Sequence, residues 1–216
     1  MSKISEKQGV EVPVFDWLGE LGWKPRTNEQ LKAHARPFSN PLIEGILVER
    51  VAHINGIALD AARRAVDTLK RALDRPIAME ANEQFLDLLC EGVTLTIDGQ
   101  DRTLKLVDFE NVWENDFSVT RQYWVQGSDL VKPDLVCLVN GIPLVAFEAK
   151  QRAHQNSDWI KGVRDLSLYE TKVPRLLMPR TKAGGSMPVA KRRWHVGCGV
   201  PRSARSGAVA AFCSMQ

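Results

Sequence analysis

Several kinds of sequence feature are missing from this chain of 216 residues. No window reaches the roughly 18 apolar residues of a membrane-spanning helix, and the opening MSKISEKQGVEV lacks the apolar core of a signal peptide. The four cysteines never occur at CxxC spacing, which argues against a zinc ribbon, a thioredoxin motif or a disulfide framework. These absences predict a protein of the reducing cytoplasm with no membrane partner.

Two common signals for nucleotide and metal chemistry are also missing. The chain has no GxxxxGK[ST] phosphate-binding loop, because the segment AGGSMP does not match one. The four histidines show no HExxH or similar spacing, so we expect no metal centre built on histidine.

Acidic residues are absent from the last part of the chain, where Glu170 is the final one. Residues 1–170 carry 20 Lys and Arg against 26 Asp and Glu, whereas residues 171–216 carry 9 Lys and Arg and no acid. From residue 179 the sequence is rich in Arg, Gly, Pro and Ser and keeps no helix or strand period. We therefore expect a folded domain over residues 1–178 and a disordered basic tail over 179–216, whose composition resembles translation in a shifted reading frame.

The order of the predicted elements indicates the fold class. Helical spacing of apolar residues is found over residues 42–55, 60–74, 83–91 and 158–169. Strand patterns are found around the turn at 98–101, over 117–126 and on both sides of Asn140-Gly141. We expect Asp60 and Asn82 to be N-caps, and the whole to be an α/β fold with a mixed sheet and helices on both of its sides.

Charged residues lie at the ends of the two most apolar predicted strands. Asp134 opens the strand before the Asn140-Gly141 turn, and Glu148 and Lys150 close the strand after it. Two carboxylates that converge at a strand end form a hard-oxygen site suited to Mg²⁺. A lysine beside them can orient a water molecule and stabilise charge on a phosphate. The pattern is typical of phosphodiester hydrolysis, and a salt-bridged hairpin end is its alternative.

Whether these groups share one face depends on the register of the hairpin. A regular hairpin with a two-residue Asn140-Gly141 loop pairs Asp134 with Phe147 and turns Glu148 to the other face. A three-residue loop, or a β-bulge within either strand, places Asp134, Glu148 and Lys150 on one face. The sequence leaves both of these arrangements open.

The aromatic and basic residues before this hairpin have simpler interpretations. We expect Trp113, Tyr123 and Trp124 to pack in or beside the sheet rather than to stack on bases. Lys132 and Arg121 could touch a DNA phosphate, but solvated surface cations are the default expectation.

The core segment KPDLVCLVNGIPLVAFEAK resembles the PD-(D/E)XK nuclease core of type I restriction endonuclease R subunits. The segments FDWLGELGW, NPLIEGILVERVAHIN, FLDLLCEGV, LVDFENVWENDFSVTRQYWVQG and DLSLYETKVPRLL follow in family order, so the resemblance spans residues 13–178. It implies a restriction-endonuclease-like fold, in which a mixed sheet is flanked by helices.

The resemblance also implies roles for individual residues. Asp134 and Glu148 would bind Mg²⁺, and Lys150 would be the catalytic lysine. Glu44 matches a helix glutamate that lies near the family's site, with a solvated helix carboxylate as its alternative.

The helix that follows the core matches the family pattern in part. Many members place a glutamine four residues before a tyrosine, and the matching positions here are Asp165 and Tyr169. Tyr169 fits the pattern and Asp165 departs from it, which puts in doubt any role that needs an amide. Residues four apart share a helix face, so a site-facing pair is still expected.

The implied function is Mg²⁺-dependent cleavage of double-stranded DNA as the nuclease part of a type I restriction-modification R subunit. Such a machine works with methyltransferase and specificity subunits, and needs ATP where motor domains are present. Family subunits are several times longer, so the sequence favours a truncated R subunit. The main alternative is a catalytically silent remnant that docks on the complex or on DNA. A stand-alone nuclease of the RecB type is disfavoured by the N-terminal resemblance.

Overall fold

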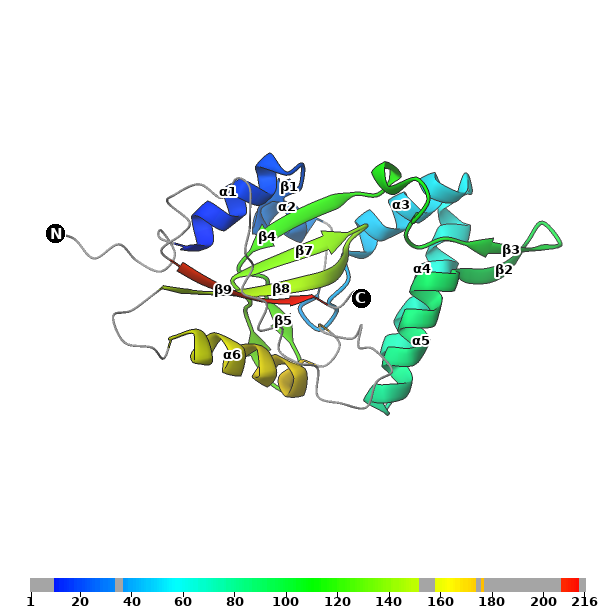
Figure 1. Ribbon diagram of the computed structural model, residues 1–216. Helices are drawn as coiled ribbons and strands as arrows, with labels where there is room; N and C mark the ends of the chain where they lie inside the picture. The colour runs from blue at the N-terminus through cyan, green and yellow to red at the C-terminus, as the bar shows by residue number, and fades with distance from the viewer. Residues whose placement is uncertain (1–9, 34–36, 152–157, 174–175, 177–206, 214–216) are drawn as a thin grey trace.

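A five-stranded mixed sheet forms the centre of the computed structural model, which describes residues 10–33, 37–151, 158–173, 176 and 207–213 (Figure 1). In spatial order its strands are β1 (Lys24–Arg26), β4 (Phe117–Arg121), β7 (Leu135–Val139), β8 (Ile142–Gln151) and β9 (Gly207–Cys213). β1 runs parallel to β4, and the other neighbours are antiparallel. The prediction of a mixed sheet is confirmed.

Helices cover both faces of this sheet (Figure 1). They are α1 (Val12–Glu20), α2 (Asn28–Ala33), α3 (Glu44–Asn55), α4 (Leu59–Leu73), α5 (Ala78–Glu91) and α6 (Asp158–Lys172). On one face Leu18 of α1 packs against Val119 and Leu135, and on the other Leu166 of α6 belongs to a cluster with Val136. Among the described residues, no helix combines the length and apolar character that crossing a membrane requires.

Helix boundaries follow local chemistry, but two N-caps expected from the sequence are wrong. The N–H of Leu42 donates to the side chain of Asn40 just before α3, and α3 ends at Gly56 in the left-handed region. Asp60, expected as an N-cap, lies in the first turn of α4, which begins at Leu59 after the extended Ala58. Asn82, also expected as an N-cap, lies buried inside α5. That helix begins at Ala78 because the preceding Ile77 is extended and the AMEA segment favours helix.

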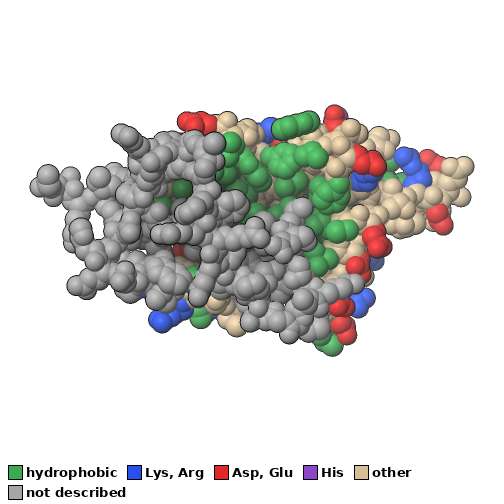
Figure 2. Space-filling view, in the orientation of Figure 1, with side chains coloured by type: hydrophobic (Ala, Val, Ile, Leu, Met, Phe, Trp, Pro, Cys, Tyr) green, Lys and Arg blue, Asp and Glu red, His purple; other side chains and the backbone are tan. Residues whose placement is uncertain are grey.

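The largest core cluster lies where α3, α4 and α5 meet two hairpin strands, β2 (Val93–Ile97) and β3 (Gln100–Leu104). α4 buries Ala62, Val66 and Leu69 on one stripe. Figure 2 shows hydrophobic side chains gathered between the sheet and this end of the molecule, with charges of both signs on the outer surface. These helices therefore pack beside the tip of the β7–β8 hairpin, whose residues Val139 and Ile142 belong to the same cluster.

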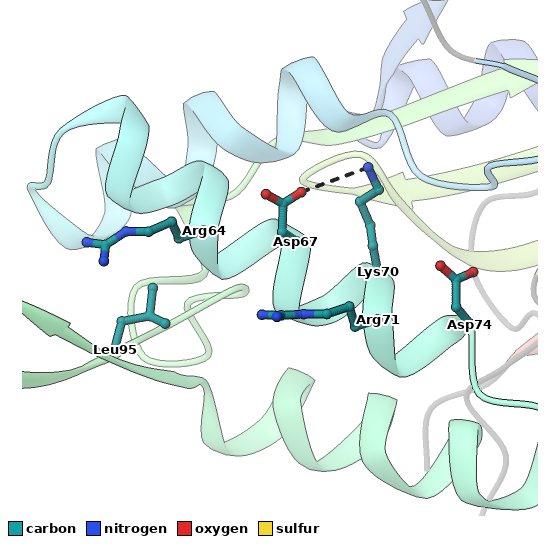
Figure 3. A pocket seen from close by; sticks show the side chains of 6 residues that line it. All are labelled: Arg64, Asp67, Lys70, Arg71, Asp74 and Leu95. Atoms are coloured by element: carbon teal, nitrogen blue, oxygen red, sulfur yellow. Dashed lines mark ion pairs between the residues drawn. The ribbon is translucent and has the colours of Figure 1, made fainter.

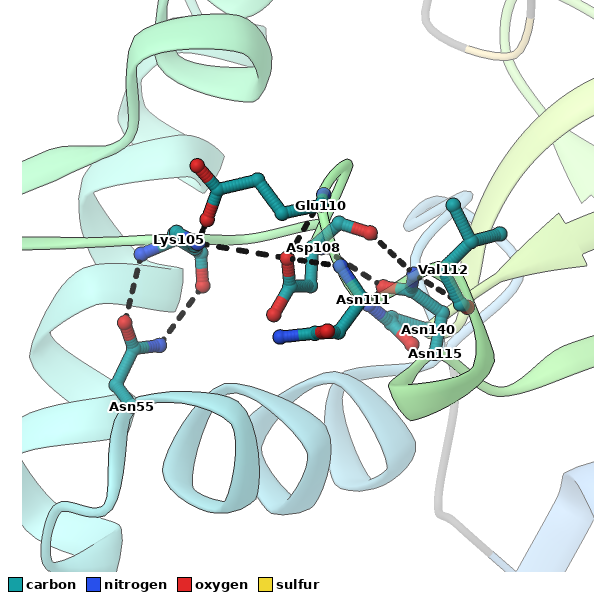
Figure 4. A network of polar contacts seen from close by, with 8 residues as sticks. All are labelled: Asn55, Lys105, Asp108, Glu110, Asn111, Val112, Asn115 and Asn140. Carbon is teal, nitrogen blue, oxygen red and sulfur yellow. Dashed lines mark hydrogen bonds and ion pairs between the residues drawn. The ribbon is translucent and has the colours of Figure 1, made fainter.

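The tip of the β7–β8 hairpin is buried. Asn140 and Gly141 have φ of 53° and 82°, as a two-residue type I′ turn requires. A Cβ on Gly141 would lie 2.7 Å from the carbonyl oxygen of Ile43, so α3 can approach only because this residue is glycine. The Asn140 side chain donates to the Leu106 carbonyl and accepts from the N–H of Asp116. It also donates to the Asn115 side chain (Figure 4). This network fixes the turn.

A β-bulge in β8 sets the register beyond the turn. Val139 pairs with Ile142, but the extra residue Leu144 shifts the ladder so that Leu135 pairs with Phe147. Ile142 and Leu144 join the cluster under α3 and α4, whereas Ala146 joins the cluster under α6. The bulge thus reverses which sheet face each side chain after Leu144 points to. A β-bulge is one of the arrangements that the sequence left open.

Part of the tail differs from the sequence prediction. Residues Gly207–Cys213 form β9, which pairs along β8 from Val145 to Gln151. These seven residues lie in the segment that was expected to be disordered, and the expectation for the tail as a whole stays a prediction. The run GAVAAFC is apolar, uncharged and free of proline, so its backbone can form hydrogen bonds with the N–H and C=O groups along the edge of β8. The rest of the tail lies outside the described residues.

Candidate functional site

Asp134 and Glu148 lie across from each other, where β7 begins and β8 nears its end. Leu135 pairs with Phe147, so the next residues outward, Asp134 and Glu148, lie opposite each other. The bulge thereby places both carboxylates on the sheet face that α6 covers. A carboxylate oxygen of Asp134 accepts a hydrogen bond of 2.9 Å from the N–H of Ala149. Glu148 is only 4% exposed. The two carboxylates predicted from the sequence therefore converge.

Tyr169 of α6 contacts this site from the helix that packs on the sheet. Its hydroxyl donates a hydrogen bond of 2.5 Å to a carboxylate oxygen of Glu148. Burial raises the pKa of Tyr169, and the bond to Glu148 and the charges of Glu148, Asp134 and Asp165 raise it further. The hydroxyl therefore stays protonated at neutral pH. Asp165 lies four residues before Tyr169 on α6, so the two residues share a face of this helix.

Lys150 lies two residues beyond Glu148 on β8, where it pairs with Ala208 of β9. Its side chain lies outside the described part of the structure. The role expected for it therefore stays a prediction.

Glu44 lies at the other end of the hairpin. The N–H of Ile43 donates to the Gly141 carbonyl, which places the start of α3 at the tip of the β7–β8 hairpin. Five strand residues separate this tip from Asp134, a distance of about 17 Å along β7. The Glu44 carboxylate accepts a hydrogen bond from Asn40 and pairs with Lys70 at 2.8 Å. The structure does not bring Glu44 into contact with the converging carboxylates, and its role at the site stays a prediction.

Lys70 also borders a surface hollow along α4 (Figure 3). The hollow is lined by Arg64, Asp67, Lys70, Arg71, Asp74 and Leu95. The bond to Glu44 chiefly raises the pKa of Lys70, against the opposing effect of burial. None of the lining residues belongs to the Asp134–Glu148 site.

The donor set at the site suits a hard cation. Within the described ranges, no group of three or more His, Cys, Asp and Glu side chains is placed to hold a metal ion. Mg²⁺ does not require such a group, because it is commonly held by one or two carboxylates and keeps several waters. Asp134 and Glu148 therefore fit Mg²⁺ as a two-carboxylate pair.

A buried acid that sequence reasoning missed supports the strand end beside Asp134. Glu11 is 3% exposed, lies 3.8 Å from Arg121 and accepts a hydrogen bond from the Gln122 side chain. The N–H of Gln122 in turn donates to the Asp134 carbonyl at 2.9 Å. No sequence signal points to Glu11, because it lies 111 positions before Gln122 in the chain.

The mixed sheet, the flanking helices and the converging carboxylates define a domain of the PD-(D/E)XK nuclease type. Comparison with known proteins agrees, because the family model "Type I restriction enzyme R protein N terminus" matches residues 3–180. The chain belongs to this family.

Two relatives show the extent of the similarity. The HindI endonuclease subunit of a type I restriction enzyme from Haemophilus influenzae is 27% identical over 180 residues, covering 78% of this chain and 17% of that protein. A Methanocaldococcus jannaschii protein, provisionally described as the MjaVIIIP endonuclease subunit, is 28% identical over 164 residues, covering 74% of this chain and 15% of that protein. The chain thus spans about a sixth of the length of these relatives.

Proposed function

We propose that this chain cleaves double-stranded DNA with the help of Mg²⁺, as the nuclease part of a type I restriction enzyme R subunit. The observation that carries the proposal is the meeting of Asp134 and Glu148, held in place by the N–H of Ala149. Family membership supports the same chemistry.

Each residue of the site has a distinct task in this proposal. Asp134 and Glu148 would hold Mg²⁺, and Tyr169 orients the Glu148 carboxylate by donating to one of its oxygens. A bound Mg²⁺ supplies Lewis-acid stabilisation of charge on the phosphate. The Lys150 ammonium would orient the attacking water and stabilise the phosphate charge.

Removal of Lys150 tests the proposal. Lys150→Ala should lower the rate of plasmid cleavage by about a hundredfold or more, because proton transfer and charge stabilisation are lost. Binding of Mn²⁺ should be nearly unchanged, since the lysine is not a ligand. Lys105→Ala removes a surface cation far from the site and should leave cleavage unchanged. Undiminished cutting by Lys150→Ala would refute the assignment.

The larger assembly is part of the proposal as well. In a type I system the chain would act with methyltransferase and specificity subunits, and ATP would be used only by a subunit that has motor domains. A catalytically silent chain that docks on DNA or on the complex is the second candidate. DNA binding by wild type without any cleavage would support this second candidate.

A further inference from the structure

An exposed aromatic surface lies next to Asp134. The rings of Phe38 and Trp124 stack with centroids 6.2 Å apart and planes 26° from parallel. They remain 44% and 36% exposed. The ammonium of Lys132 lies 5.1 Å from the centroid of the Trp124 ring. These three residues are here called the aromatic platform. The sequence predicted packing for Trp124 and a solvated cation, or contact with a DNA phosphate, for Lys132, and it gave no prediction for Phe38.

The platform is anchored to buried structure on both sides. The N–H of Gln126 donates to the Phe38 carbonyl at 2.8 Å. Tyr123, which precedes Trp124, is fully buried, and its hydroxyl donates to the Pro41 carbonyl at 2.6 Å. The backbone that carries the two rings is therefore fixed before any ligand arrives, which reduces the entropy cost of binding.

The platform also adjoins the site directly. The N–H of Tyr123 bonds to the Pro133 carbonyl, and the N–H of Gln122 to the Asp134 carbonyl. Lys132 precedes Asp134 by two residues, which separates their Cα atoms by at most about 7 Å. A DNA strand advances about 3.4 Å per nucleotide in a stacked duplex and further where it is unstacked, so this distance spans at most about two nucleotides. A strand whose phosphate reaches Asp134 and Glu148 therefore passes the platform.

We propose that the aromatic platform binds an unstacked base of a DNA strand, with Lys132 on the adjoining phosphate. Aromatic faces stack on any base, and a lysine beside them neutralises backbone charge. The ligand is single-stranded or locally opened DNA, because neighbouring base pairs cover the base faces of an intact duplex. The position of this strand relative to cleavage rests on the proposed function, but the binding itself does not.

Binding of a 20-nucleotide oligothymidine to the full chain in EDTA tests the stacking. Trp124→Ala should weaken binding roughly 5- to 140-fold, which corresponds to about 1–3 kcal/mol per stacked base. Trp124→Phe keeps an aromatic face and should recover most of the affinity. Trp113→Ala is the matched control, because Trp113 is 91% exposed and lies in the 3₁₀ helix Val112–Glu114, before β4. A 20-base-pair duplex should bind all variants alike.

The salt dependence tests Lys132 separately. Lys132→Gln should reduce the slope of log affinity against log salt by about 0.7, the value for one phosphate contact on a single strand. Arg63→Gln, on the exposed side of α4, should leave the slope unchanged. Phe38→Ala provides a second stacking variant should Trp124→Ala unfold.

The outcomes separate this proposal from the proposed function. Equal binding by Trp124→Ala, Phe38→Ala and Trp113→Ala overturns the platform. Weakened binding by the first two variants, together with no cleavage by wild type, supports the platform and counts against the nuclease. Because the basic tail is present in every variant, its nonspecific binding cancels from each comparison.

Discussion

Single side chains fix the strand ends, and Asp116 illustrates this at the residue scale. Its carboxylate is 7% exposed and pairs with Lys24 and Arg26 of β1. Burial acts to raise the pKa of Asp116, but the bonds from the two cations outweigh it, so the pKa lies below its ordinary value. The stabilisation is therefore present above the unfolded-state pKa and is lost as the pH falls through the folded-state pKa.

Asp116→Asn should lower the free energy of unfolding by about 1.5–3 kcal/mol at pH 7, because it removes a charge from buried hydrogen bonds. The difference from wild type should shrink as the pH falls below about 3.9. Urea unfolding over this pH range measures it. Asp60→Asn, whose side chain is 90% exposed, is the control and should change little. A pH-independent difference would contradict the ion-pair explanation.

Asp134→Asn tests the metal pair without disturbing the backbone. The amide oxygen can still accept from the N–H of Ala149, but the charge that attracts Mg²⁺ is lost. We expect weak Mn²⁺ binding by wild type in calorimetry and loss of most of that affinity in the variant. Asp129→Asn, on the exposed surface near Lys172, serves as the control. Equal binding by Asp134→Asn and wild type would exclude Asp134 as a ligand.

At the scale of elements, β9 alters the interpretation of the tail. It lies beside the half of β8 that carries Glu148 and Lys150. Deletion of residues 207–216 should lower the thermal midpoint, because β8 loses its outer partner and its backbone groups must turn to water. Deletion of 214–216 alone is the control. An unchanged midpoint in the longer deletion would show that β9 adds nothing to the stability of the sheet.

The sequence predicted most elements but not how they pair. Helical spacing located α3 and α4 within a few residues, and the two apolar runs predicted the central hairpin. The bulge at Leu144 could not be predicted, because strand patterns give alternation but not the place where one extra residue enters. β9 was missed because seven residues within a patternless tail carry too little periodicity.

The site was predictable to the same degree. Asp134, Glu148 and Tyr169 lie together because strand ends and a helix face repeat at known spacings, while their roles stay predictions. Glu11 and the aromatic platform depend on tertiary contacts between distant segments, which local patterns do not encode.

For the whole molecule, the absence of a GxxxxGK[ST] loop predicts activity without nucleotide. Cleavage by the purified chain should be slow, nonspecific and equal with and without ATP. The conversion of supercoiled plasmid to nicked and linear forms measures this, with Asp134→Asn as the inactive control. A stimulation by ATP would mean that the chain contains a nucleotide site of another kind.

The extra residue at Leu144 gives the hairpin one residue of slack. Loss of any single residue from 143 to 147 can be absorbed by straightening the ladder, after which Glu148 still faces Asp134. Gain of one residue has no such remedy, because a second irregularity would be needed beside the first. Length changes in β8 are thus tolerated unequally: shortening can preserve the carboxylate pair, whereas lengthening separates it.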